Sequence, residues 1–336
     1  MNKYRWNINE IRTQMEKDLK NPDILENKDL LNYTKSVYNI LFCLYDIYRS
    51  NSFNEKNNID ETEEPCYINN EAFIIMYNQI INDVSKIKEI DFNQSKIIIN
   101  FNNDELIEIV EEFIKQIPDK NLLKYFKEYF NPNNNFINII YKKYNIIDAN
   151  GICISNFNNK KAYTCILREN STIDILVVLH EFFHAYLRKE EIYNFQSQPN
   201  SIYAETEGYF ANILANYLSK KIIGKYMFDK VIYGDFNNIL VNSKYFKIIN
   251  NESTSSNDNL SFIKEILDES FSYLSAIDLF YLYKIDPEKA LFFIKKIPSL
   301  TGQNIRSELL KNNITFLEDH CKNFKTLSKE LRKPRN

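Results

Sequence analysis

Glycine and proline are scarce in this chain, with only 5 Gly and 8 Pro among 336 residues. Because both residues mark turns and end helices, their scarcity favours long helices over a sheet-rich fold with many tight turns. Aromatic residues are plentiful, with 23 Tyr and 24 Phe, and hydrophobic residues make up 44% of the chain. A chain of this length and composition can bury a large apolar core.

The chain also lacks a large net charge and long apolar runs. The formal net charge of −3 gives no reason to expect a nucleic-acid partner, since phosphate binding depends on clustered positive charge. No apolar run approaches the roughly 20 residues needed to cross a bilayer. The first residues, MNKYRWNINEIRTQ, contain no apolar stretch typical of a signal peptide. We therefore expect a cytoplasmic protein that binds neither membrane nor nucleic acid, while its oligomeric state is not indicated.

Five cysteines are present, an odd number without the spacing of a metal site. Free or buried thiols in a reducing compartment are their expected state. Cys153 and Cys165 flank a predicted hairpin and could approach each other, so a disulfide between them is the alternative.

Apolar residues recur at helical spacing through most of the chain, and strand patterns are few. The predicted helices cover residues 8–20, 28–50, 69–88, 104–117, 119–130, 172–189 and 201–221. Strands are predicted at 151–155 and 162–167, with a weaker candidate at 97–100. Polar stretches at 52–65, 131–136 and 250–259 are expected to be loops.

These patterns predict a mainly α protein, with one small β-sheet beside a central helix. Residues 1–95 are expected to form an N-terminal helical region. Residues 96–336 would then form the catalytic domain, with the hairpin at about 151–167. The role of the N-terminal region is not indicated by the sequence.

The central predicted helix contains ILVVLHEFFHAYL, which places His180, Glu181 and His184 in an HExxH arrangement. Residues four apart share one face of a helix, so both imidazoles can reach one ion. Glu181 can lie close to the same site without binding the ion, which suits a general base that acts on metal-bound water. The chain has only three histidines, and the residues around this pair are apolar, where unpaired polar groups are costly. The pattern therefore predicts a zinc site.

A catalytic zinc ion takes three protein ligands and keeps one position for water. His320, the remaining histidine, lies in a polar C-terminal segment, so acidic residues are better candidates. Glu205 and Glu207 both stand near the start of a predicted helix, where the helix dipole also favours acidic residues. Residues two apart on a helix point in different directions, so only one of them can face the histidine pair. The spacing alone leaves both open.

The segments LHEFFHAYL and QPNSIYAETEGYF resemble the active-site motif of the thimet oligopeptidase and oligoendopeptidase F peptidases. Members of that family carry HExGH, then Gln-Pro, then a Ser-Ile-aromatic-x-Ala-Glu segment whose Glu is the third zinc ligand. The resemblance implies that His180, His184 and Glu205 bind Zn²⁺, that Glu181 is the general base, and that the substrate is a peptide. It extends over roughly residues 100–317, and only the zinc motif in it is highly specific.

Three departures from the family pattern affect the expected chemistry. Phe183 replaces the glycine inside the motif and narrows the space beside the metal. The family's C-terminal histidine, which helps to bind the substrate and the oxyanion, has no counterpart here. Tyr273 matches its position best, with Tyr281 and Tyr283 as alternatives and helix packing as the ordinary role of each tyrosine. The chain is also shorter than typical members, so the lobe that walls off the substrate channel is expected to be reduced.

The leading hypothesis is a zinc metalloendopeptidase that hydrolyses oligopeptides or exposed peptide segments, with Glu181 and Tyr273 as catalytic residues. The alternative is a catalytically weak or inactive zinc protein that binds peptides or regulates a partner. The missing histidine motivates this alternative, whereas Glu181 has no use in a protein that only binds. Manganese or cobalt stays open as the metal, although two His and one Glu favour zinc.

Overall fold

The computed structural model describes residues 3–50, 87, 101–141, 150–156, 161–188, 205–219, 232, 234–241, 257–296 and 320–331. Within these residues the chain is mainly helical and has one small mixed sheet, which confirms the predicted fold class. Contacts along the chain group it into two compact units. Unit 1 comprises Met1–Glu63 and Ile98–Ser197, and unit 2 comprises Glu64–Ile97 and Gln198–Asn336. The division predicted at residue 95 stays a prediction, because most of residues 51–100 lie outside the described part.

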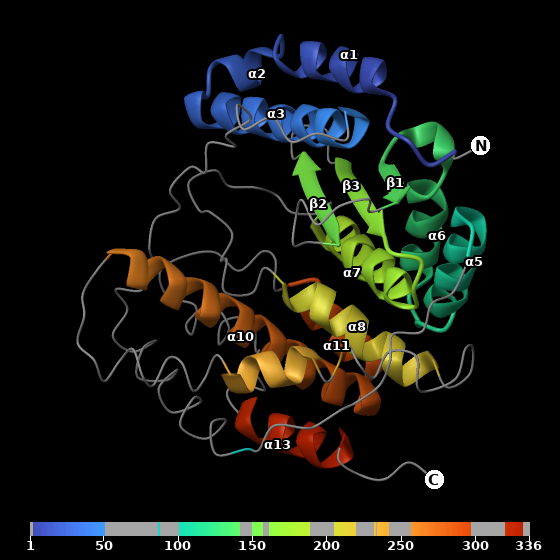
Figure 1. Cartoon of the computed structure of the whole chain (residues 1–336), viewed down its shortest axis with the longest axis vertical. Helices are drawn as coiled ribbons and strands as arrows, with labels where there is room; N and C mark the ends of the chain where they lie inside the picture. The colour runs from blue at the N-terminus through green and yellow to red at the C-terminus, as the bar shows by residue number, and fades with distance from the viewer. Residues whose placement is uncertain are drawn as a thin grey trace. The chain divides into compact units, whose positions relative to one another are not determined.

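Unit 1 contains the sheet and the helices around it (Figure 1). Its elements are α1 (Ile8–Asp18), α2 (Pro22–Leu25), α3 (Lys28–Ser50), α5 (Asn103–Ile114), α6 (Lys120–Tyr129), the 3₁₀ turn η2 (Pro132–Asn134), β1 (Ile137–Tyr141), β2 (Gly151–Asn156), β3 (Lys161–Arg168) and α7 (Ile173–Arg188). The helices expected at 8–20, 28–50, 104–117, 119–130 and 172–189 are thus present with slightly shifted ends. The helix expected at 69–88 and the strand expected at 97–100 fall outside the described residues.

The sheet has the strand order β1-β3-β2. The antiparallel pair β2 and β3 is the predicted hairpin, and β1 pairs parallel with β3. The sequence analysis missed β1, whose residues INIIY follow the Asn-rich turn at 131–136. Across the hairpin Cys153 lies opposite Thr164 and Ile152 lies opposite Cys165, so the two cysteines are not directly paired. Neither of them forms a disulfide, and Cys43 forms none either, so the alternative of a Cys153–Cys165 disulfide is not seen in the structure.

The two faces of the sheet pack against different helices. Successive strand residues point to opposite faces. Tyr163, Cys165 and Leu167 therefore share one face, where they join a buried cluster with residues of the N-terminal segment and α3, including Tyr38 and Leu41. The other face packs against α7, which contacts both β2 and β3 (Figure 1). The central helix is thus held directly on the sheet, as predicted.

An N-cap residue and one buried ion pair hold the first turns of α5 and α7 beside the sheet. Asn102 caps α5 and forms a capping box with Glu105. At the end of β3, the buried Arg168 guanidinium donates to Asp174 Oδ2 in the first turn of α7 at 3.2 Å. It also donates to Asn103 Oδ1 at 2.7 Å, at the start of α5. The first bond connects the end of β3 to the first turn of α7, and the second connects it to the first turn of α5.

Unit 2 is built on helices alone in its described part. Its elements are α8 (Thr206–Leu218), α10 (Asn257–Ile285), α11 (Pro287–Ile294) and α13 (His320–Leu331), and α10 contacts each of the other three. The helix expected at 201–221 is present as α8, whereas the loop expected at 250–259 ends earlier, because α10 begins at Asn257. None of the helices in the described ranges is long and apolar enough to cross a membrane.

Candidate metal centre

Helix α7 holds the HExxH residues on a firmly packed support. Phe182 and Phe183 are buried, and the Phe182 ring lies against aromatic rings of α6, at 5.1 Å from Phe126 and 5.9 Å from Tyr125 between centroids. Phe182 is two positions from each histidine, so its side chain points away from theirs. Its burial against α6 therefore fixes the rotation of α7. The His180 and His184 rings then share another face, with their centroids 4.7 Å apart. The helical spacing of the motif has the consequence expected from the sequence.

Glu181 lies against the first residue of β2. The residue is only 7% exposed, and Gly151 faces its side chain so closely that no β-carbon fits between them. A β-carbon at residue 151 would lie 2.6 Å from both Cγ and Oε1 of Glu181. Sequence reasoning did not single out Gly151, although a glycine in a strand often marks a close approach.

Glu205 stands immediately before α8, at its N-cap position. Its side chain accepts no capping hydrogen bond from the first turn of the helix. Its backbone N–H donates instead to the hydroxyl of Ser272 on α10, at 3.2 Å. The carboxylate of Glu205 is therefore not used as a helix cap.

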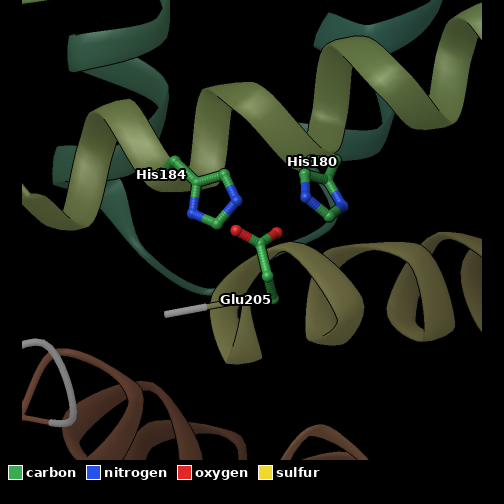
Figure 2. A group of neighbouring side chains, drawn as sticks. All are labelled: His180, His184 and Glu205. Carbon is green, nitrogen blue, oxygen red and sulfur yellow. The ribbon is translucent and has the colours of Figure 1, made fainter. Parts of the chain in front are cut away.

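Three side chains supply a donor set suited to a metal ion. His180, His184 and Glu205 each offer one ligand atom, and these atoms all lie within 4.8 Å of one another (Figure 2). His184 is buried, while the other two are partly exposed. Two imidazoles and one carboxylate are a donor set of catalytic zinc sites, so the residues fit the metal that the sequence predicts. No second group of this kind occurs among the described His, Cys, Asp and Glu residues.

Glu207, the other ligand candidate, is not in this group. It lies in the first turn of α8 and is almost fully buried, with 1% of its surface exposed. The difference from Glu205 agrees with the expectation that residues two apart face different directions. The ligand role of Glu205 itself stays a prediction until metal binding is measured.

Tyr273, the expected oxyanion donor, lies in the interior of unit 2. It is fully buried on α10, and its hydroxyl donates to the backbone carbonyl of Ile232 at 3.2 Å. Burial, and then the negative charge of Asp235, raise the pKa of the Tyr273 hydroxyl well above its usual value. Burial is also the main cause of the raised pKa of the alternatives Tyr281 and Tyr283. The burial of Tyr273 and its bond to Ile232 agree with a packing role, and its catalytic role stays a prediction.

Comparison of the sequence with known protein families gives no match, and comparison with curated proteins gives none either. Solved structures do match. A proposed oligoendopeptidase F from Bacillus anthracis strain Ames has a TM-score of 0.54 and 13% identity, over 92% of this chain and 64% of that chain. A proposed peptidase from Chlamydophila abortus has a TM-score of 0.54 and 11% identity, over 90% and 60%. A further proposed oligoendopeptidase F has a TM-score of 0.56 and 10% identity, over 93% and 66%. The chain shares their fold.

This chain spans 64%, 60% and 66% of the length of those three structures. At such low identity the likeness shows the fold of peptidase structures and does not itself transfer an activity. It does agree with the fold that the resemblance implies.

Proposed function

We propose that this chain is a zinc-dependent endopeptidase of the HExxH type, related to the oligoendopeptidases, that cleaves oligopeptides or exposed peptide segments. The observation that carries the proposal is the grouping of His180, His184 and Glu205 within 4.8 Å, with Glu181 next to one of the ligands in sequence. The fold shared with proposed oligoendopeptidase structures supports the same class of reaction.

In this proposal His180, His184 and Glu205 hold the ion, and Glu181 moves the proton. When bound, zinc supplies a Lewis acid that lowers the pKa of a water ligand to about 7 and polarises a carbonyl oxygen. Glu181 takes a proton from the attacking water and delivers it to the leaving amine. Its close packing against Gly151 restricts where the carboxylate can lie, which suits a base that must act at one position.

The edge of β2 that has no partner strand among the described residues supports a peptide as the substrate. Among the described residues, β2 pairs only with β3 and so lies at an edge of the sheet. An exposed edge offers backbone N–H and C=O groups to which an extended peptide can add as a further strand. Because β2 begins at Gly151 beside Glu181, a peptide bound along this strand would pass close to the general base.

A second candidate function is a weak or inactive zinc protein that binds peptides or regulates a partner. The observation in its favour is the burial of Tyr273, whose hydroxyl donates to Ile232. An oxyanion that lacks a second donor would depend on the metal alone, and loss of one such donor typically costs a hundredfold or more in kcat. The presence of Glu181 argues for the active form.

Metal analysis of the purified protein, combined with a library of quenched fluorescent peptides, tests the proposal. We expect one zinc ion per chain and peptide cleavage. Glu181→Gln is expected to keep the zinc and the fold but to lower kcat by about a hundredfold or more. Stoichiometric zinc without cleavage would favour the binding function, and a Glu181→Gln variant with wild-type kcat would contradict the mechanism.

A further inference from the structure

The start of α8 lacks the usual means of fixing the N-cap residue. In a capping box, a Glu or Gln at the third helical position accepts a hydrogen bond from the N-cap backbone N–H. With Glu205 as the N-cap, the third helical position is Gly208, which has no side chain to do this. Helix ends are also where helices fray. A metal ligand at this position therefore needs support from outside the helix.

Helix α10 supplies that support at two points. The Ser272 hydroxyl accepts the Glu205 backbone N–H at 3.2 Å, in place of the missing capping box. The Glu205 carbonyl in turn accepts the backbone N–H of Tyr209 at 3.0 Å. The Tyr209 hydroxyl then donates to Oε1 of Glu269 on α10, at 3.3 Å. Both backbone groups of Glu205 are thus tied to α10, one directly and one through Tyr209.

The side chain of Tyr209 is itself held in place. Its ring packs edge-on against the ring of Tyr273, with the centroids 5.2 Å apart and the planes at 89°. Burial and then the negative charge of Glu269 raise the pKa of the Tyr209 hydroxyl, so it stays a hydrogen-bond donor at neutral pH. Tyr273 therefore has a definite packing role in this arrangement, whatever its part in catalysis.

We propose that Ser272 and Tyr209 are positioning residues, which hold the backbone of Glu205 so that its carboxylate is ready to bind the metal. This inference rests on the proposed function, in which Glu205 is a zinc ligand. Fixing a ligand before the metal arrives removes part of the entropy cost of binding. Partners that orient metal ligands are typically worth about tenfold to a hundredfold in metal affinity.

The test measures the Zn²⁺ dissociation constant of the full chain by competition with a chromophoric chelator. Ser272→Ala is expected to weaken zinc binding about tenfold, and Tyr209→Phe, which removes only the hydroxyl, to weaken it severalfold. Ser275→Ala is the matched control, because Ser275 is also fully buried on α10 and its hydroxyl has no hydrogen-bond partner among the described residues. That control is expected to bind zinc within twofold of the wild type.

A double variant separates positioning from general loss of stability. Ser272→Ala added to Glu205→Ala is expected to cause no further loss of affinity, because the ligand that Ser272 positions is already gone. The unfolding temperature of the metal-free Ser272→Ala protein checks that it folds.

The outcomes distinguish this inference from the proposed function. If Glu205→Ala loses zinc but Ser272→Ala and Tyr209→Phe both bind like the wild type, positioning by α10 is wrong and the ligand assignment stands. Equal weakening by Ser272→Ala and Ser275→Ala also overturns positioning. A wild-type protein that binds no zinc, or a Glu205→Ala variant that binds it fully, overturns the ligand assignment and this inference together.

Discussion

Gly151 and Glu181 approach so closely that a β-carbon on the glycine would lie 2.6 Å from the carboxylate Oε1. Gly151 is the first residue of β2 and Glu181 lies in α7, so the contact fixes the distance between the start of the strand and the proposed base. The same β-carbon would lie 2.8 Å from Cγ1 of Val177, one turn earlier on α7. The carboxylate is the more easily displaced of the two neighbours, because it stands at the end of a flexible side chain.

Gly151→Ala is therefore expected to displace the Glu181 carboxylate and to lower kcat. Misplacement of a reacting group by about 1 Å can cost on the order of a hundredfold, so we expect a loss of tenfold to a hundredfold. Zinc content should not change, because Glu181 is not a ligand. Gly234→Ala is the control, since a β-carbon there meets nothing within 4 Å. The effect should vanish in a Glu181→Gln background, and its persistence there would rule out this explanation.

Glu205→Ala is expected to abolish tight zinc binding, whereas Glu207→Ala is expected to retain it. The reason is that Glu205 lies with the two histidines, while Glu207 is buried elsewhere on the first turn of α8. Zinc content after dialysis against a weak chelator measures the difference. Because Glu207→Ala also leaves a cavity, Glu207→Gln serves as the isosteric control. The reverse pattern would transfer the ligand role to Glu207.

Tyr273→Phe tests the oxyanion role inferred from the family resemblance. If the Tyr273 hydroxyl donates to the oxyanion in the transition state, the variant should have at least a tenfold lower kcat, with zinc content and KM nearly unchanged. If the hydroxyl only donates to the Ile232 carbonyl, the variant should lose about 1 kcal/mol in the free energy of unfolding and keep its kcat. Both quantities should be measured on one preparation. A wild-type kcat would remove Tyr273 from the catalytic residues and leave Tyr281 and Tyr283 to be tested.

Asp235→Asn is expected to change how stability depends on pH. Burial, and then the negative charge of Glu269, raise the pKa of Asp235 from 3.8 to about 7. Between these values the folded protein keeps a proton that the unfolded chain has lost, so rising pH lowers the free energy of unfolding. Asn cannot lose a proton, and the variant should lack this part of the decline.

Urea unfolding of the metal-free proteins at several pH values between 4 and 8 measures this effect. The stability of Asp235→Asn relative to the wild type should increase from pH 4 to pH 7 and then level off. Parallel curves for the two proteins across this range would show that Asp235 titrates normally in the folded state.

Short-range patterns in the sequence determined the helices, the hairpin and the relation between His180 and His184. These features depend on residues a few positions apart, and helical or strand spacing places such residues in a known geometry. The strand at Ile137–Tyr141 was missed because periodicity alone does not distinguish a short apolar run from part of a buried helix, and no hairpin turn joins it to β3, with which it pairs in parallel.

Only the tertiary structure decided the contacts between elements far apart in the chain. Gly151 meets Glu181 because β2 packs on α7, and the Glu205 backbone meets Ser272, 67 residues later, because α8 packs on α10. The same packing buries Tyr273 and gives its hydroxyl a partner at Ile232. Local spacing carries no information on such distances, since they depend on which faces of the folded elements come together. The sequence by itself therefore determined which residues form the HExxH pair, and the packing of the helices and strands decided which other residues contact Glu181 and the backbone of Glu205.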